Sequence, residues 1–285
     1  MQSATGNVIT VINYIEEHLN ETLDLDRIAN AVHYSKYHLH RMFVHEIGIT
    51  IHDYVQRRKL TEAAKLLIFS DQPIMEIALL AGYESQQAFT AIFKEMYKKT
   101  PNRYRKDEEF YPLQLRYVLN NSPMKFEKAA FWQKQIVFAT LDDIPDWMSL
   151  LPLVIDGFPY LDERQYVTKL QESIDHKRAL ILKDADTAVG AMAFHEKTGG
   201  IDFLGVHPQY RKQGIAKAFI RRALEECRDI DKDVSITTFR EGDKADTGYR
   251  DTLKKLGFTE ADLLVEFGYP TQRLILKKEN LEETG

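Results

Sequence analysis

The chain of 285 residues lacks several features that would point to particular classes of protein. It has one cysteine, Cys227, so it cannot form an internal disulfide, which is compatible with a reducing cytoplasm. No apolar run approaches the roughly 18 residues of a membrane helix, and the polar N-terminus lacks the apolar core of a signal peptide. We therefore expect a cytoplasmic protein without a membrane partner.

The chain also lacks Cys and His residues at the spacing of a zinc site, and it has no excess of basic residues. His38 and His40 are two residues apart, whereas a metal clasp on a helix needs three or four, so we expect no metal site. Residues 1–107 hold 13 basic and 13 acidic residues, which leaves 25 basic and 30 acidic residues for 108–285 and gives the net charge of −5. Nucleic-acid binding must then depend on the local placement of cations in the first part, and the acidic second part argues against such binding there.

The residues from Ala81 to Arg105 carry the clearest pattern in the first part of the chain. A tight turn precedes a helix whose apolar residues share one face: Phe89, Ile92, Phe93 and Met96. Thr100 and Pro101 then end this helix and begin another, as N-cap and first helical residue. The polar face of the first helix carries short polar side chains and several amides, which suits the reading of base edges in a DNA major groove.

An upstream stretch repeats this arrangement. A short amphipathic helix with Leu25, Ile28, Ala29 and Val32 precedes an N-capped helix after Tyr34, which turns Leu39, Met42 and Phe43 inward. A long helix from about residue 50 to residue 69 separates the two pairs, with core positions at Tyr54, Leu60, Ala63, Ala64 and Leu67.

From about residue 7 to residue 106, these motifs resemble the DNA-binding domain of AraC/XylS-family transcription regulators. One departure is Lys98, where the family usually has glycine at the helix end. The resemblance implies two recognition helices that enter successive major-groove segments of one DNA face, about one helical turn apart. The candidate DNA-contacting residues are Ser35, Lys36, Tyr37, His40, Arg41, Ser85, Gln86, Gln87, Thr90 and Lys94.

Cations for the DNA backbone would come from Arg41, Arg57, Arg58, Lys59, Lys98, Lys99, Arg103 and Arg105. The run Arg57-Arg58-Lys59 is equally consistent with a solvated helix face.

Strands alternate with helices in the second part, which predicts an α/β sheet. The strands are expected at residues 136–140, 179–182, 188–195, 199–206, 234–239, 263–267 and 273–276. The helices are expected at 141–153, 163–176, from the Gly214 turn to about 228, and from an N-cap at Asp246 to 256.

One turn in this part has the chemistry of a phosphate cradle. Val206-x-Pro208-x-x-Arg211 leads into Gly214-x-Ala216 at a helix start, where small residues let a ligand approach the backbone. The free N–H groups and positive dipole of the helix start favour an anion. A plain strand-to-helix turn with a structural glycine is the alternative.

This turn and the order of elements from about residue 134 to residue 278 resemble the GNAT acetyltransferase superfamily. The resemblance implies acetyl-CoA as the cofactor, with the backbone from Leu204 to Val206 pairing with its pantetheine arm. The turn that binds its pyrophosphate comprises Arg211, Lys212, Gln213, Gly214, Ile215 and Ala216.

Acetyl transfer also needs a base for the amine and a proton donor for the leaving thiolate. Many GNAT enzymes carry a donor tyrosine four residues before a Gly-Phe pair, and this chain has Leu253 there; Tyr249, one turn earlier, is the candidate donor. Asp202 is the candidate base because it shares the strand parity of Leu204 and Val206, but it is equally an exposed strand-end carboxylate. His195 and Glu196 are weaker candidates, and water positioned by the substrate can also serve.

We therefore expect a multidomain chain. An all-α paired helix-turn-helix domain occupies residues 1–107, and an α/β GNAT domain with a mixed sheet occupies 134–285. The segment 108–133 is rich in aromatic residues, and its stretch from Leu113 to Tyr117 alternates like a strand. We expect this segment to pack on one domain or to bridge both.

Two functions remain open. The first is a bacterial-type transcription regulator that binds double-stranded DNA and acetyl-CoA and transfers the acetyl group to a small amine. The second is a regulator whose GNAT-like domain senses acetyl-CoA or another ligand without turnover, which the absence of the usual tyrosine favours slightly. A stand-alone acetyltransferase with a helical decoration is disfavoured by the specificity of the pattern from Ala81 to Arg105.

Overall fold

The computed structural model describes residues 4–119, 134–154, 163–185, 187–226, 233–266 and 268–277. Two compact units divide the chain, one built from the described residues up to 119 and the other from those from 134 onward. Cys227 lies outside the described residues.

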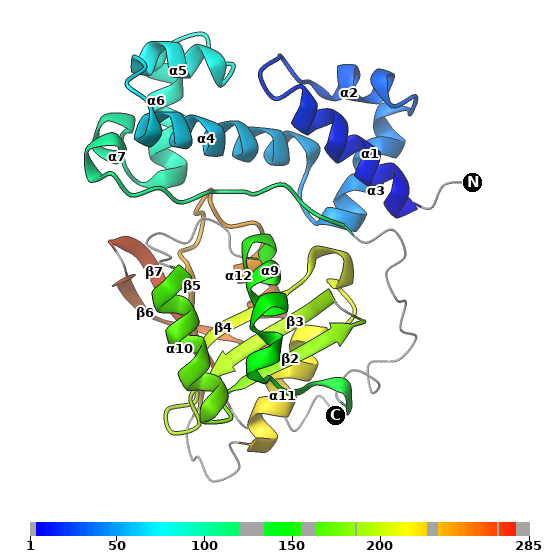
Figure 1. The fold of residues 1–285 in the computed structure, drawn as a ribbon, viewed down its shortest axis with the longest axis vertical. Coiled ribbons are helices and arrows are strands. Elements are labelled where there is room, and N and C mark those ends of the chain that lie inside the picture. The colour runs from blue at the N-terminus through cyan, green and yellow to red at the C-terminus, as the bar shows by residue number, and fades with distance from the viewer. Residues whose placement is uncertain are drawn as a thin grey trace. The chain divides into compact units, whose positions relative to one another are not determined.

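The first unit is all helical, as expected (Figure 1). Its helices are α1 (Ala4–Glu17), α2 (Leu25–Ala31), α3 (Lys36–Ile47), α4 (Ile51–Phe69), α5 (Ile74–Leu80), α6 (Gln86–Tyr97) and α7 (Pro101–Asp107). The inward faces are those that the periodicity predicts: Leu39, Met42 and Phe43 of α3 and Phe89, Phe93 and Met96 of α6 are buried. Ile92 is only partly buried.

Four helices of the first unit, α3, α4, α6 and α7, begin directly after a residue with a hydroxyl side chain. Ser35, Thr50, Ser85 and Thr100 each accept a hydrogen bond from the backbone N–H three residues later. Each cap satisfies a donor that the first helical turn leaves unpaired. The end of α6 is less favourable, because Lys98 takes the left-handed conformation that glycine adopts most easily, with φ +60°.

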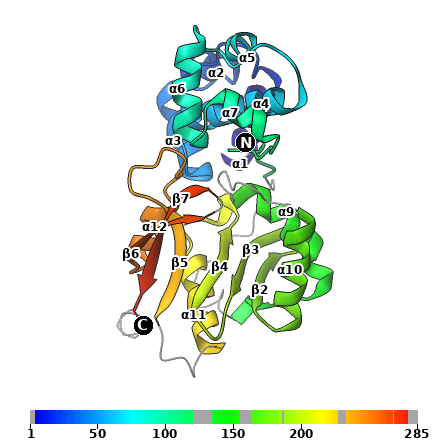
Figure 2. The same ribbon diagram turned by 90° about the vertical axis from the view of Figure 1, so that its left-hand side faces the viewer.

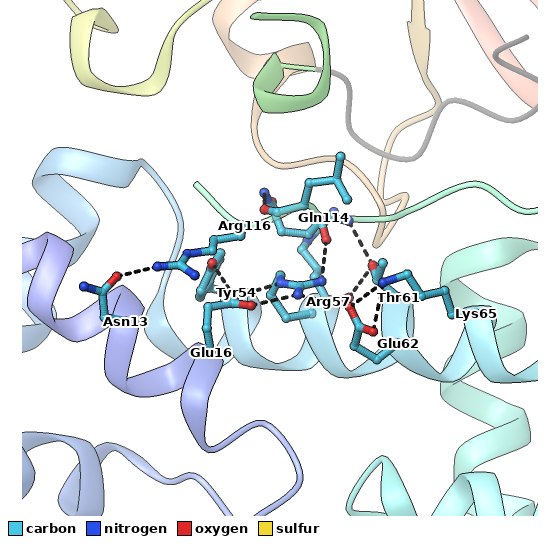
Figure 3. A network of polar contacts seen from close by, with 11 residues as sticks. Asn13, Glu16, Tyr54, Arg57, Thr61, Glu62, Lys65, Gln114 and Arg116 are labelled. Atoms are coloured by element: carbon cyan, nitrogen blue, oxygen red, sulfur yellow. Dashed lines mark hydrogen bonds and ion pairs between the residues drawn. The ribbon is translucent and has the colours of Figure 1, made fainter. Parts of the chain in front are cut away.

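Residues 110–119, which we name the strap, run beside α4 as an extended segment (Figures 1 and 3). The strand predicted at residues 113–117 is wrong, because the strap pairs with no strand of the described chain. Thr61 of α4 accepts the backbone N–H groups of Leu113 and Gln114 instead, each at 3.1 Å. The aromatic residues Tyr111 and Tyr117 are buried against the first unit.

A buried charge network ties the strap to α1 and α4 (Figure 3). Glu16 of α1 accepts hydrogen bonds from Arg58 Nε and Nη2, both at 2.8 Å, and from the Tyr54 hydroxyl at 2.7 Å. Arg58 also donates to the backbone carbonyl of Gln114 at 3.2 Å. Arg116 of the strap donates to Asn13 of α1 at 2.7 Å, so one segment fastens two helices that are distant in sequence.

The second unit contains the expected α/β sheet. Its elements are β1 (Val137–Phe138), η1 (Leu141–Asp143), α9 (Ile144–Val154), α10 (Glu163–Asp175), β2 (Ala179–Asp184), β3 (Thr187–Phe194), β4 (Gly200–Val206), η2 (Pro208–Tyr210), α11 (Ile215–Glu226), β5 (Val234–Phe239), α12 (Tyr249–Lys255), β6 (Thr259–Glu266) and β7 (Tyr269–Leu276). The strand order is β1-β2-β3-β4-β5-β7-β6, and the sheet is mixed because β4 and β5 are parallel while the other neighbours are antiparallel.

Helices cover both faces of this sheet (Figure 2). Trp147 and Leu150 of α9 and Leu170 of α10 pack on one face, with Ile181 and Ala191 of the strands. The other face packs against α11 and α12 through a second cluster. The start of α12 differs from the expectation: Gly248 is the N-cap residue, and the Asp246 carboxylate accepts the N–H groups of residues 248 to 250 from two residues upstream.

Candidate functional site

The polar face of α3 is open to solvent. Lys36, Tyr37, His40 and Arg41 are exposed, and the Tyr37 side chain is 80% exposed although it is large and aromatic. Ser35 is occupied as the helix cap. A row of exposed side chains that can donate and accept hydrogen bonds, held by a buried apolar face, is the arrangement that a recognition helix needs.

The polar face of α6 is similar in burial but less charged. Gln86, Gln87 and Lys94 are exposed, Thr90 is half-buried, and Ser85 is occupied as the cap. Gln86 and Gln87 lie in the first turn, so their amides are free to extend beyond the helix end. The amide group can pair bidentately with adenine in a major groove.

Most of the cations that we expected to contact DNA are engaged within the unit. Arg57 and Arg58 are buried, at 3% and 6% exposure, so the expectation of phosphate contacts from them is wrong. The pattern of α4 shows only one partner of Arg58, Glu62, because the others, Glu16 and the carbonyl of Gln114, lie on α1 and in the strap. Lys59 donates to the carbonyl of Glu21 at 2.7 Å, and Arg105 donates to two carbonyls near the end of α4.

Three further cations pair with carboxylates or a carbonyl. Lys99 and Arg103 both contact Asp107, at 2.7 and 2.8 Å, and Lys98 donates to the carbonyl of Glu95. On the recognition face, Lys36 pairs with Asp26 at 2.6 Å. Arg41 has neither an ion pair nor a side-chain hydrogen bond within the described chain, so its guanidinium is available to a ligand.

In the second unit, β4 and β5 separate after a short parallel contact. They pair only at Gly200 with Ser235 and at Ile201 with Ile236. Beyond these residues the strands diverge, and the polar backbone edge of β4 is left for other partners. We name the space between the diverging strands the β4–β5 gap.

The turn expected to bind phosphate follows β4 after the short helix η2. Gly214 has φ +80° and Lys212 has φ +63°, so the backbone coils tightly before α11 begins at Ile215. The side chain of Ile215 is buried in the core, as is that of Leu204, so these two residues can offer a ligand only their backbone groups. Lys212 is exposed, and Arg211 donates through Nε to the carbonyl of Val206 at 3.3 Å.

Tyr249 reaches into this region from α12. Its hydroxyl donates to the backbone carbonyl of Leu204 at 3.1 Å, which places it at the β4 edge of the gap. Burial raises the pKa of Tyr249, although the charge of Arg211 opposes the shift, so the hydroxyl keeps its proton at neutral pH. Leu253, which holds the position of the usual donor tyrosine, is buried in the core instead.

Asp202 and Leu204 point to opposite faces of β4, so the expectation that they share a face is wrong. A bulge in β4 brings Ile201 and Leu204 to the same face, because Phe203 pairs with Ala193 and Ile201 with Phe194. Asp202 faces the α9 and α10 side, where its carboxylate lies 2.9 Å from His195 Nε2.

The surroundings of Asp202 affect its proton affinity. Desolvation raises the pKa of its carboxyl group, while His195, Arg178 and Lys169 oppose the shift. Arg178 donates to His195 Nδ1 at 3.1 Å, so His195 Nε2 carries the proton toward Asp202. Sequence reasoning missed Arg178, and no local signal could have found it, because β2 and β3 bring it beside His195 only in the fold.

Metal and membrane features are not found in the described ranges. No group of three or more His, Cys, Asp or Glu side chains there could hold a metal ion. None of the described helices is long and apolar enough to cross a membrane.

Comparison with known proteins assigns both units. A family described as a helix-turn-helix domain matches residues 28–107, and the acetyltransferase (GNAT) family matches residues 145–258. The probable transcription factor PqrA of Proteus vulgaris is 42% identical over 104 residues, which are 35% of this chain and 85% of PqrA. The chain belongs to the AraC family of transcription regulators.

Its second unit is a GNAT-family domain, so this AraC-family chain joins two known domain types. The uncharacterised HTH-type regulator YbfP of Bacillus subtilis is 39% identical over 127 residues, which are 41% of this chain and 43% of YbfP. The chain thus spans less than half the length of that relative. A GCN5-related N-acetyltransferase from Kribbella flavida has a TM-score of 0.35 and 18% identity, over 44% of this chain and 32% of that one.

Proposed function

We propose that this chain is a sequence-specific transcription regulator that binds double-stranded DNA through α3 and α6. The observation that carries the proposal is the pair of capped helices with buried apolar faces and open polar faces. Arg41 would read guanine and Gln86 and Gln87 would read adenine, as their side chains commonly do. Because its relatives PqrA and YbfP are bacterial proteins, we place the chain in a bacterial cytoplasm.

The second unit, in this proposal, binds acetyl-CoA along β4. Gly214 at positive φ and the N–H groups at the start of α11 suit the pyrophosphate, with Lys212 close by in the turn and exposed. The carbonyls of Leu204 and Val206 accept from Tyr249 and Arg211, so both point out of the β3–β4 ladder toward the gap. The residues present therefore fit the cofactor, which would supply an activated acyl group as a thioester.

In this proposal the acyl group is transferred to an amine across the β4–β5 gap, with the acid and the base on opposite faces of the sheet. Tyr249 packs with the α11 and α12 side of the sheet, and Asp202 lies on the α9 and α10 side. Asp202 would take the proton that the amine loses in such a transfer. Tyr249, held protonated by burial, would give a proton to the leaving sulfur.

One observation favours the alternative of a non-catalytic sensor. Leu253 occupies the usual donor position and is buried in the core, so it contributes no proton donor. The hydroxyl of Tyr249 must then act from one turn earlier. A chain that binds acetyl-CoA but releases no CoA with any amine would be such a sensor.

Two measurements test these proposals separately. Selection of bound sequences from random double-stranded DNA, followed by titration, should yield a preferred site; equal affinity for all sequences would contradict the first proposal. Calorimetry with acetyl-CoA should show binding, and a panel of amines should then release free CoA from the wild type. Tyr249→Phe should keep acetyl-CoA affinity within a few-fold and lower the turnover rate by about 10²- to 10⁴-fold. Unchanged turnover would remove Tyr249 from the mechanism.

A further inference from the structure

Thr238 of β5 has a buried hydroxyl that the fold does not use. Its side chain is 6% exposed, and Oγ1 has no hydrogen-bond partner among the described residues. Buried polar groups in folded proteins are nearly always paired, because an unpaired one costs stability. An exception therefore calls for an explanation in terms of a ligand or of packing.

The strand register places Thr238 across the β4–β5 gap from Leu204. Ile236 pairs with Ile201, and Thr238 lies two residues further along β5. The bulge at Asp202 adds one residue to β4, so Leu204 lies at the same level on the other side of the gap. This is the level at which the Tyr249 hydroxyl meets the Leu204 carbonyl.

Thr238 also faces the same side of the sheet as Leu204. Val234 and Ile236, which share its strand parity, pack in one core cluster with Leu204, and Tyr249 packs against that cluster. The hydroxyl of Thr238 thus lies on the α11 and α12 side, at the inner part of the gap. The phosphate turn lies beyond Val206, at the other end of this stretch of β4.

We propose that the Thr238 hydroxyl binds the acylated end of acetyl-CoA. A ligand whose pyrophosphate lies at Gly214 and whose arm follows β4 toward Ile201 brings its thioester to the level of Leu204. A threonine hydroxyl can donate to a carbonyl oxygen or accept from an amide N–H, and both groups occur at that end of the ligand. This assignment rests on the proposed function, because it presupposes acetyl-CoA in the gap.

Thr238→Val separates a binding role from a packing role, because valine has nearly the same shape and no hydroxyl. Whether the hydroxyl binds a ligand or is only packed in the core, the variant should have a higher melting temperature than the wild type, since the unpaired hydroxyl is gone. A binding role alone predicts that calorimetry shows about 5- to 10-fold weaker acetyl-CoA binding in the same variant. Thr238→Ser, which keeps the hydroxyl, should bind within about twofold of the wild type.

Thr237→Val is the matched control, because Thr237 points to the opposite face of β5 and should change acetyl-CoA affinity by less than about twofold. Unchanged affinity in Thr238→Val, or a lower melting temperature, would overturn the inference while leaving the cofactor proposal intact. A wild type that binds no acetyl-CoA would instead refute the proposed function, and the role of Thr238 with it.

Discussion

The buried pair between Glu16 and Arg58 allows a stability prediction with a matched control. Glu16→Gln keeps the shape of the side chain but removes the charge that neutralises Arg58, whose side chain is 7% exposed. Breaking a buried ion pair costs about 3–5 kcal/mol, because the remaining charge stays buried without compensation. Glu62 still contacts Arg58 Nη2 at 3.1 Å in the variant, so we expect the lower end, about 3 kcal/mol.

Urea unfolding followed by helical circular dichroism measures this effect. With a slope of about 2 kcal/mol per molar urea, the transition midpoint of the first unit should fall by about 1.5 M.

Glu62→Gln is the control, because it removes a charge from the same arginine at a site where the carboxylate is 38% exposed. Exposed ion pairs contribute about 0–1 kcal/mol, so its midpoint should fall by less than about 0.5 M. Equal shifts in the two variants would refute the reasoning, because burial would then not determine the strength of the pair.

Four further outcomes are expected. Arg41→Ala should weaken specific DNA binding by about 1–3 kcal/mol and relax preference at one base pair, whereas equal loss on random DNA would make Arg41 a phosphate contact. Gly214→Glu should abolish acetyl-CoA binding measured by calorimetry; Gly214→Ala, which shares the strain at φ +80° but not the charge, should bind better than Gly214→Glu. Lys98→Gly should raise stability in thermal unfolding by about 0.5–1 kcal/mol, and a loss would contradict the strain assigned to φ +60°. If the two activities are coupled, acetyl-CoA should shift DNA affinity by about 5- to 150-fold, and DNA should shift acetyl-CoA affinity by the same factor.

Local chemistry was enough to predict α3, α4, α6 and α7 of the first unit and most of the inward faces of α3 and α6. Thr100 and Pro101 begin α7 as expected, because a cap hydroxyl and a proline at the first helical position act within a few residues. The predicted burial of Phe89 and Phe93 is confirmed for the same reason, since a period of 3.6 residues fixes which side chains share a face.

Features that depend on distant partners could not be predicted in this way. The alternation from Leu113 to Tyr117 resembles a strand, but hydrogen bonds to Thr61 hold that segment against a helix. The prediction that Asp202 faces the same side of the sheet as Leu204 failed because of one bulged residue in β4. The bulge reverses the direction of every side chain before it relative to those after it. Neither Thr61 nor the bulge leaves a sign in the local sequence.

The burial of Arg57 and Arg58 also changes how the first unit can recognise DNA. Counterion release scales with the number of phosphates that cations neutralise, and this unit commits many of its cations to its own carbonyls and carboxylates. Its affinity must then depend more on base contacts and on backbone N–H groups at helix starts than on bulk charge. Such a protein loses less DNA affinity with added salt than a basic domain of equal size. It also has a larger ratio of specific to non-specific DNA binding, because charge supplies mainly the non-specific binding.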